Sequence, residues 1–188
     1  MDPAPALFDM GYPSGFEYLP DWISSDEEDA LLRNIESLSF EDVRMHGLVA
    51  KRQVVHFGWD YGYETWRLTP TKAIPAWLIP LRNRAALLVK HDPEALEQAL
   101  INRYPMRAGI GWHRDAPMFG PVVVGISLFG PCRMRFQRNR NGRRELAGCL
   151  LDPRSAYVLR GEARVSWQHC ISPTKALRYS VTFRTLNK

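Results

Sequence analysis

The sequence predicts a mainly β protein of the α+β class, with a jelly-roll or other double-sheet core and a few supporting helices. From about residue 102 onward the chain is a series of short strand-like runs separated by turn residues. The helical patterns, in contrast, are confined to the first half. The chain has 188 residues, of which 45% are hydrophobic, and this is enough to build a core.

The first half contains the predicted helices. It opens with an irregular arm, residues 1–20, which is rich in Pro, Gly and aromatic residues. Ser25-Asp-Glu-Glu28 matches a capping box and predicts a helix over about 26–38. Pro80 in an opening turn predicts a second helix that reaches about Lys90. Asp92-Pro93-Glu94 has the N-cap pattern and predicts a third helix, which ends before Asn102.

Residues 51–63, between the first two helices, are dense in aromatic residues and glycine and are flanked by basic residues. A strand and turn of this composition fits two interpretations. The rings can pack on the core, or they can form a flap that stacks on a planar ligand.

The second half consists of predicted strands. They run over Pro121–Leu128, Cys132–Gln137, Leu146–Leu151, Ala156–Arg160, Arg164–Ile171 and Arg178–Arg184, with a turn at Asn139–Gly142. Such regularly spaced strands are typical of two stacked sheets.

Composition narrows the class of protein. The three cysteines, Cys132, Cys149 and Cys170, have no paired spacing, so we expect no disulfide framework. We read no signal peptide and no run of apolar residues long enough to span a membrane, and we therefore expect a cytoplasmic protein.

The net charge of +5 favours an anionic partner. Between residues 133 and 144 the chain has many arginines and no acid, at Arg133, Arg135, Arg138, Arg140, Arg143 and Arg144. This segment fits either a solvated strand edge and hairpin or a phosphate-contacting surface.

His113-x-Asp115 is a candidate pair of metal ligands. Residues two apart on a strand point to the same face, so the imidazole and the carboxylate would lie side by side. A non-haem iron site needs two histidines and one carboxylate on one face, and a third ligand must therefore come from elsewhere.

The third ligand has few candidates among the five histidines of the chain. His46 lies in an irregular stretch and His91 at a helix boundary, where surface positions explain both. His169 lies in a predicted strand and is either a hydrogen-bonded core histidine or the missing ligand. A zinc site that uses Cys170 beside His169 is less favoured, because adjacent strand residues face opposite ways.

The last strand carries Arg178, Ser180, Thr182 and Arg184 on one face and Tyr179, Val181 and Phe183 on the other. Two inward-facing arginines in a β-sandwich need anions to pair with. Their side chains could reach opposite ends of one small dicarboxylate. Alternatively, the polar face of this strand is its solvent face.

Jointly these motifs resemble the AlkB family of Fe(II)/2-oxoglutarate dioxygenases. The similarity rests on Asn102-x-Tyr104, His113-x-Asp115, Gly161-Glu-Ala-Arg164, His169 and the strand Arg178–Arg184, and it covers about residues 50–187.

The resemblance implies a double-stranded β-helix core with iron bound by His113, Asp115 and His169. It implies that 2-oxoglutarate is bound by Asn102, Tyr104, Arg178 and Ser180, with Arg184 nearer the metal, and that O2 is the oxidant. Family chemistry hydroxylates an N-alkyl carbon, and the product then loses formaldehyde. We expect one compact unit in which residues 1–90 form an arm, helices and a nucleotide-recognition lid, and residues 91–188 form the dioxygenase core.

The implied partner is alkylated DNA or RNA, bound by a monomer away from any membrane. The substrate residues expected from the flap and the basic segment are Arg52, Phe57, Trp59, Tyr61 and Arg143. DNA-repair members often have an acid two residues after the metal Asp, where this chain has Pro117, so we expect no base readout from that residue. The flap also resembles that of the family's tRNA wobble-uridine hydroxylases, which is our second hypothesis, together with action on a protein. A non-catalytic nucleic-acid-binding module of the same fold is the third.

Overall fold

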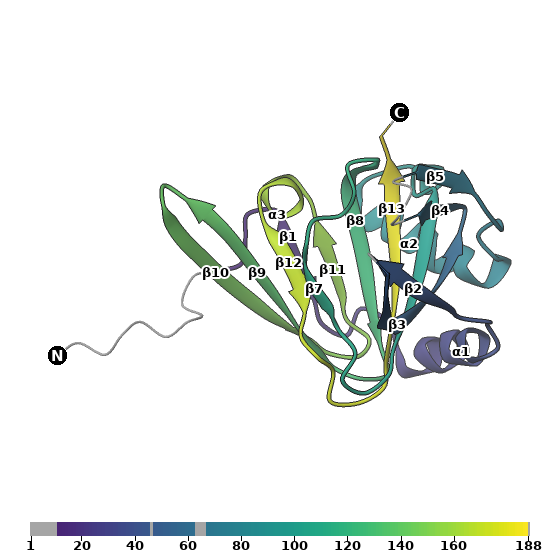
Figure 1. Ribbon diagram of the computed structural model, residues 1–188. Coiled ribbons are helices and arrows are strands. Elements are labelled where there is room, and N and C mark those ends of the chain that lie inside the picture. The colour runs from purple at the N-terminus through teal and green to yellow at the C-terminus, as the bar shows by residue number, and fades with distance from the viewer. Residues whose placement is uncertain (1–10, 46, 63–66, 188) are drawn as a thin grey trace.

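Two facing β-sheets form the centre of the molecule (Figure 1). The computed structural model describes residues 11–45, 47–62 and 67–187. Every strand pair in it is antiparallel. The predicted jelly-roll class is thus confirmed.

The larger sheet has seven strands. In spatial order they are β1 (Phe16–Leu19), β11 (Ala156–Leu159), β8 (Phe119–Leu128), β13 (Arg178–Leu186), β6 (Gln98–Tyr104), β3 (Leu48–Phe57) and β2 (Glu41–Met45). The last strand of the chain, β13, lies at the centre between β8 and β6.

The smaller sheet has four strands, in the order β10 (Arg143–Leu151), β9 (Cys132–Arg140), β12 (Gln168–Ile171) and β7 (Ile110–His113). The β9–β10 hairpin projects from the two sheets (Figure 1). Its two-residue turn has Asn141 at φ 51° and Gly142 at φ 74°, the left-handed pair that a tight hairpin requires, and the predicted turn is confirmed. A separate two-stranded ribbon, β4 (Trp59–Gly62) with β5 (Arg67–Pro70), follows β3.

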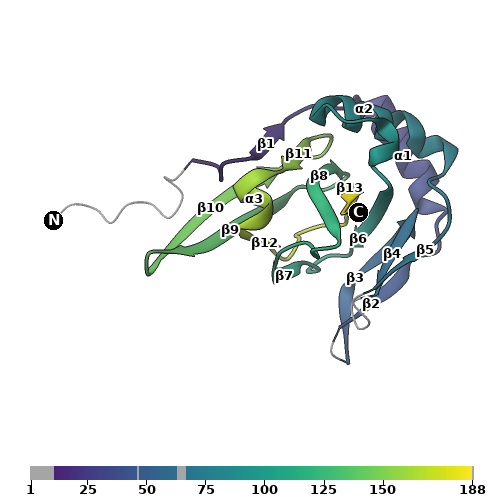
Figure 2. The ribbon, with the colours of Figure 1, turned by 90° about the horizontal axis from the view of Figure 1, so that it is seen from above.

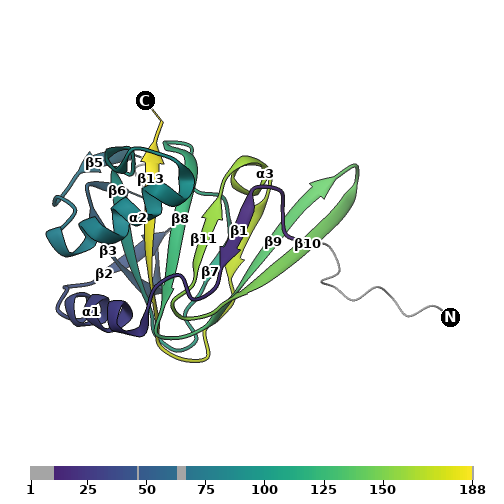
Figure 3. The same ribbon diagram turned by 180° about the vertical axis from the view of Figure 1, so that it is seen from behind.

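Two helices cover the outer face of the larger sheet (Figures 2 and 3). They are α1 (Ser25–Glu36) and α2 (Ile79–Val89), both close to prediction, and α2 follows a short turn, η1 (Ala76–Leu78). Their apolar sides pack against the sheet residues Val124, Ile126, Val181 and Phe183 in one buried cluster. No helix of the described part of the chain is long and apolar enough to cross a membrane.

The capping box of α1 lies one residue before the predicted one. Ser24 is the N-cap, its Oγ accepts from the Glu27 N–H, and the Glu27 carboxylate accepts from the Ser24 N–H. Both serines have a glutamate three residues on, so the pattern fits either register. In the register adopted, Glu28 is buried, accepts from the Phe129 N–H and pairs with Arg154. Tertiary contacts of Glu28 therefore agree with the chosen register.

Three local predictions were wrong. Residues 16–19 of the expected arm form β1, because pairing with β11 extends the sheet. The third helix is only one turn, η2 (Pro93–Ala95), because β6 begins at Gln98 and pairs on both sides. Residues 164–167 are not strand: α3 (Gly161–Val165) precedes β12.

Strand β13 has one face in the apolar core and the other face on a polar cavity. Tyr179, Val181 and Phe183 pack under the helices, as the alternation predicts. Arg178, Ser180 and Thr182 are also buried, but they line a cavity between the sheets. The polar face of this strand is therefore not its solvent face.

Candidate active site

A cavity of about 760 Å³ lies between the two sheets. Its wall on the larger sheet includes inward-facing residues of β3, β6 and β13, which are in register with one another. Arg178 faces Tyr104, Ser180 faces Asn102 and Arg184 faces Gln98 across the β13–β6 pair. Because side chains alternate along each strand, these polar residues collect on one side of the sheet.

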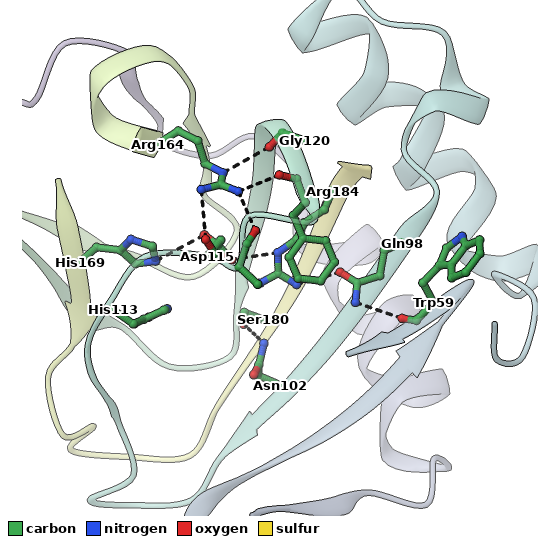
Figure 4. Close-up of polar contacts among 12 residues, drawn as sticks. Trp59, Gln98, Asn102, His113, Asp115, Gly120, Arg164, His169, Ser180 and Arg184 are labelled. Carbon is green, nitrogen blue, oxygen red and sulfur yellow. Dashed lines mark hydrogen bonds and ion pairs between the residues drawn. The ribbon is translucent and has the colours of Figure 1, made fainter. Parts of the chain in front are cut away.

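The second wall brings His113 and His169 together. Strands β7 and β12 pair so that the two residues stand opposite each other, and their ring centroids are 4.3 Å apart. Asp115 follows β7, with its Oδ2 3.8 Å from His169 Nε2 (Figure 4). His46 is outside the described residues, and His91 contacts Val89 O just beyond the end of α2.

The protonation states of these three side chains suit a metal. Burial lowers the pKa of His169 to about 3, with His113 as the next contribution, and burial also lowers the pKa of His113. Burial alone would raise the pKa of Asp115, but the Arg184 guanidinium and the two histidines hold it well below its usual range. At neutral pH the site thus contains two neutral imidazoles and a carboxylate, the forms that bind cations.

The orientation of the His113 ring also suits metal binding. His113 Nδ1 lies 2.9 Å from the Gly111 carbonyl oxygen, to which it must donate, so Nε2 is left with its lone pair. As the side chains stand, no group of three or more His, Cys, Asp or Glu side chains among the described residues is arranged to hold a metal ion. Asp115 Oδ1 instead contacts Arg184, at 3.0 Å from Nε and 2.8 Å from Nη2. The donor set fits a metal, although the carboxylate is oriented by an arginine.

Arg178 lies at the other end of the cavity and is almost completely buried. Its Nη2 donates to Ser127 Oγ at 2.8 Å, and its guanidinium lies 4.8 Å from the centre of the Tyr104 ring. Its Nε and Nη1, however, are buried without a hydrogen-bond partner. Unpaired buried donors are unfavourable, and an anion bound in the cavity that Arg178 lines could satisfy them.

Polar side chains connect the two ends of the cavity. Asn102 donates to Ser180 Oγ at 3.4 Å and accepts from Arg52 Nη1 at 3.1 Å. Arg184 donates to Gln98 Oε1 at 2.9 Å as well as to Asp115. All five residues predicted to bind 2-oxoglutarate, Asn102, Tyr104, Arg178, Ser180 and Arg184, thus line this one cavity.

Arg164 holds the loop that carries Asp115. From α3, its guanidinium donates to the carbonyl oxygens of Asp115, Ala116, Phe119 and Gly120, at 3.3, 3.1, 2.9 and 3.3 Å respectively. Figure 4 shows this side chain above the metal-site residues. Sequence reasoning found the motif around Arg164 but not this role, because its partners are backbone atoms more than 40 residues away.

The predicted substrate residues divide into two groups. Tyr61 and Arg52 line the cavity, and Pro117 lies on its wall. Phe57 does not: it is buried in the core cluster beneath the helices, which corrects its predicted stacking role. The cause is strand alternation, since β3 directs Arg52 and His56 inward and Phe57 to the opposite face.

Trp59 and Arg143 also lie outside the cavity lining. The Trp59 ring points away from the metal-site residues (Figure 4), and its backbone oxygen accepts from Gln98 Nε2 at 3.0 Å. Arg143 is exposed at the tip of the projecting hairpin, paired in register with Arg140. Neither position supports contact with a base inside the cavity.

His56 is a cavity residue that the sequence reasoning missed. It lies inward on β3, with Nε2 3.4 Å from Asp60 Oδ1, and burial lowers its pKa. The available signal was its spacing of four from Arg52, which places both residues on one strand face.

The chain is similar in sequence and in fold to known proteins. The family model described as the 2OG-Fe(II) oxygenase superfamily matches residues 15–184. The chain is 31% identical over 183 residues to the alkylated DNA repair protein ALKBH8 homolog of Arabidopsis thaliana, covering 84% of this chain and 50% of that protein. It is 29% identical over 170 residues to the tRNA (carboxymethyluridine(34)-5-O)-methyltransferase alkbh8 of Xenopus tropicalis, covering 87% of this chain and 26% of that protein.

Among solved structures, OsALKBH1 matches with a TM-score of 0.70 at 15% identity, covering 91% of this chain and 96% of that one. At this identity the likeness concerns the fold. The chain spans half or less of the length of the Arabidopsis and Xenopus relatives.

Proposed function

Because the chain belongs to the 2OG-Fe(II) oxygenase superfamily, and its relatives are AlkB homologues, we propose that it oxidises modified bases of DNA or RNA. It is a 2-oxoglutarate-dependent dioxygenase, and its cofactors are Fe(II), 2-oxoglutarate and O2. The proposal rests on the difference in chemical groups between the two ends of one cavity. A carboxylate and two neutral imidazoles stand at one end, and a buried arginine with unpaired donors stands at the other.

His113, Asp115 and His169 would hold the iron, which when bound supplies the activation of O2. Arg178 would pair with the distal carboxylate of 2-oxoglutarate, and its Nε and Nη1 would thereby gain acceptors. Asn102, Tyr104 and Ser180 surround the same end of the cavity. Arg184 lies at the metal end of the cavity, where its contact with Asp115 would orient this carboxylate.

The substrate is proposed to be an N-alkylated base that is flipped into the cavity. The volume of about 760 Å³ is within the ordinary range for small-molecule sites and exceeds what the co-substrate alone needs. Tyr61 is buried on the wall and makes an edge contact with Phe119. This ring and His56 would face the base.

The overall reaction balances without a further reductant. One oxygen atom of O2 enters succinate as 2-oxoglutarate loses CO2. The other enters a C–H bond of the alkyl group, and the resulting hemiaminal releases the free base and an aldehyde. The role of the protein in this reaction is to orient the alkyl carbon and to exclude water.

A second candidate is hydroxylation of a modified uridine in tRNA. It is favoured by relatives whose names refer to tRNA carboxymethyluridine, and by Pro117, whose side chain can accept no hydrogen bond from the exocyclic amine of a base. The methyl transfer in those names is not proposed for this chain, which covers about a quarter of those proteins.

The test incubates the protein with Fe(II), 2-oxoglutarate and O2, and with methylated oligonucleotides, etheno-modified oligonucleotides or tRNA. Mass spectrometry follows the nucleic acid while succinate is measured in parallel. Loss of the alkyl mass supports dealkylation, and a gain of one oxygen on tRNA supports the second candidate. If succinate forms but both nucleic acids stay unchanged while a protein is modified, the nucleic-acid proposal is wrong. No succinate with every cofactor present would contradict the roles given to His113, Asp115 and His169.

A further inference from the structure

A second, polar pocket lies beside the iron-site cavity. Its volume is about 510 Å³, and its lining includes Arg114, Gln137, Arg144 and Gln168. Arg114 lines both this pocket and the larger cavity. The two spaces therefore adjoin at the ends of β7 and β12, where the strands carry His113 and His169.

One wall of the pocket is the outer face of the smaller sheet. Gln137 of β9 stands opposite Gln168 of β12, and Gln137 Nε2 donates to Gln168 Oε1 at 2.9 Å. His169, the next residue, points to the inner face because strand side chains alternate. The β9–β10 hairpin, which projects from the body in Figure 1, brings Arg144 to the same side.

The charges in this pocket are unevenly compensated. Arg138 pairs with Glu145 at 2.5 Å and with Glu162 at 2.9 Å, and it lies over the Trp167 ring. Arg114 donates to the Ser166 carbonyl oxygen at 3.1 Å, and Arg144 donates to Gln137 Oε1. Both acceptors are neutral, so these contacts orient the two guanidiniums without cancelling their charge.

No Asp or Glu is among the described residues that line the pocket. The guanidinium groups of Arg114 and Arg144 thus lie in one concave site with three amide side chains, those of Gln137, Asn139 and Gln168. Guanidinium groups bind the oxygens of phosphate in a bidentate manner, and amides add neutral donors. The site matches a singly charged group that carries several acceptor oxygens.

We propose that this pocket binds a phosphodiester group of the nucleic-acid strand whose modified base enters the iron-site cavity. The inference rests on the proposed function. It adds that the phosphodiester backbone of the nucleic acid and its modified base are bound at two different sites. A strand is favoured over a free anion because Arg114 joins the two spaces, so that one ligand can occupy both. Within the basic hairpin, the proposal assigns the principal phosphate contact to Arg144 and not to its neighbour Arg143.

The test compares Arg144→Gln, Arg114→Gln and the double variant with wild type and with Arg33→Gln. Arg33 is exposed on α1, across the larger sheet from the pocket, so its loss changes net charge equally without touching the site. Binding of a single-stranded N-methylated oligonucleotide is measured by fluorescence anisotropy over a range of salt concentrations. Kinetic constants are measured for that oligonucleotide, for the matching nucleoside 5′-monophosphate and for the nucleoside.

The double variant is expected to weaken oligonucleotide binding by roughly three- to tenfold and to reduce the slope of log K against log salt by about 0.7 per lost contact. For Arg144→Gln alone, whose side chain is not part of the iron-site cavity lining, KM for the oligonucleotide should rise, whereas kcat/KM for the nucleoside, which has no phosphate, should stay at the wild-type value. An equal loss for nucleoside and monophosphate, or for Arg33→Gln and Arg144→Gln, would overturn the assignment. An effect on the monophosphate equal to that on the oligonucleotide would mean that the pocket binds a terminal phosphate, contrary to the diester proposal.

The two proposals fail in different ways. If wild type binds and oxidises the oligonucleotide but the variants behave identically to it, only the pocket assignment is wrong. If wild type neither binds nor oxidises any nucleic acid although succinate forms, the proposed function is wrong and the pocket assignment falls with it.

Discussion

Replacing Arg178 with methionine should weaken co-substrate binding strongly without destabilising the protein. Arg178 is 1% exposed, yet only its Nη2 has a hydrogen-bond partner, while Nε and Nη1 are buried without one. Each unsatisfied buried donor is unfavourable by about 1–3 kcal/mol, which offsets what the Ser127 bond and the Tyr104 ring contribute. Methionine has similar length and no donors. Without 2-oxoglutarate, the free energy of unfolding of Arg178→Met should therefore equal that of wild type or exceed it by about 1 kcal/mol.

With 2-oxoglutarate bound, wild type should be more stable than Arg178→Met. Truncating one partner of a buried charge pair weakens binding by about 2–5 kcal/mol, or at least about thirtyfold in Kd. At a 2-oxoglutarate concentration of about 100 times its Kd, wild type should gain about 2.7 kcal/mol, and thus about 5–10 °C in Tm. With a Kd about a hundredfold higher, the variant should gain about 0.4 kcal/mol, or about 1 °C.

The assay is thermal unfolding under anaerobic Fe(II), so that no turnover occurs, over a titration of 2-oxoglutarate. Arg164→Met is the matched control, because Arg164 is also buried but has all its nitrogens bonded to carbonyl oxygens. That variant should lose stability, whereas Arg178→Met should not. A fall in the Tm of ligand-free Arg178→Met together with an unchanged 2-oxoglutarate shift would refute the reasoning.

Three further outcomes follow from the same site. His113→Ala and His169→Ala should each abolish iron-dependent succinate formation and lower bound Fe(II), measured by metal analysis, while circular dichroism stays that of the folded protein; turnover near the wild-type rate would rule out the ligand assignment. Arg164→Met should lower the free energy of unfolding by about 3 kcal/mol or more and the Tm by about 6–12 °C, because four carbonyl acceptors around Asp115 lose their donor, and chemical denaturation should show it. The metal-free protein should lose stability as the pH falls from 6.5 towards 3, because unfolded His169 takes up a proton near its ordinary pKa while folded His169 does so only at about 3. Below about pH 4, protonation of Asp115, whose pKa is lowered by folding, adds to the loss. In urea unfolding measured at several pH values, the free energy of unfolding of His169→Ala should change less steeply between pH 6.5 and 4 than that of wild type. An identical pH dependence would show that another group titrates.

Local sequence rules worked where one segment determines its own structure. The turn at Asn141 and Gly142 follows from the left-handed backbone of a two-residue hairpin. The two faces of β13 follow from strand alternation, and Tyr179, Val181 and Phe183 are buried under the helices as predicted. The same alternation along β3 places Arg52 and His56 on one face and Phe57 on the other, and applying it would have replaced Phe57 by His56 in our prediction.

Predictions failed where distant segments decide the outcome. The cap at Asp92 opens a single turn because β6 pairs on both sides from Gln98 onward. The two possible capping boxes of α1 are equivalent in sequence, and the buried contacts of Glu28 agree with only one of them. Propensity is weak compared with such tertiary pairing.

By itself the sequence determined the set of chemical groups: the His113-x-Asp115 pair, one further histidine flanked by apolar residues, and two arginines on one strand face. Only the tertiary structure decided that these groups meet, because β7 and β12, more than 50 residues apart along the chain, pair with His113 opposite His169. It also decided that Arg178 is buried with unpaired donors, and that Arg114 and Arg144 converge on a second pocket. The physical reason is that side-chain types and strand periodicity are local properties, whereas the register between strands, and with it burial and the distances between charges, arises only when the sheets assemble.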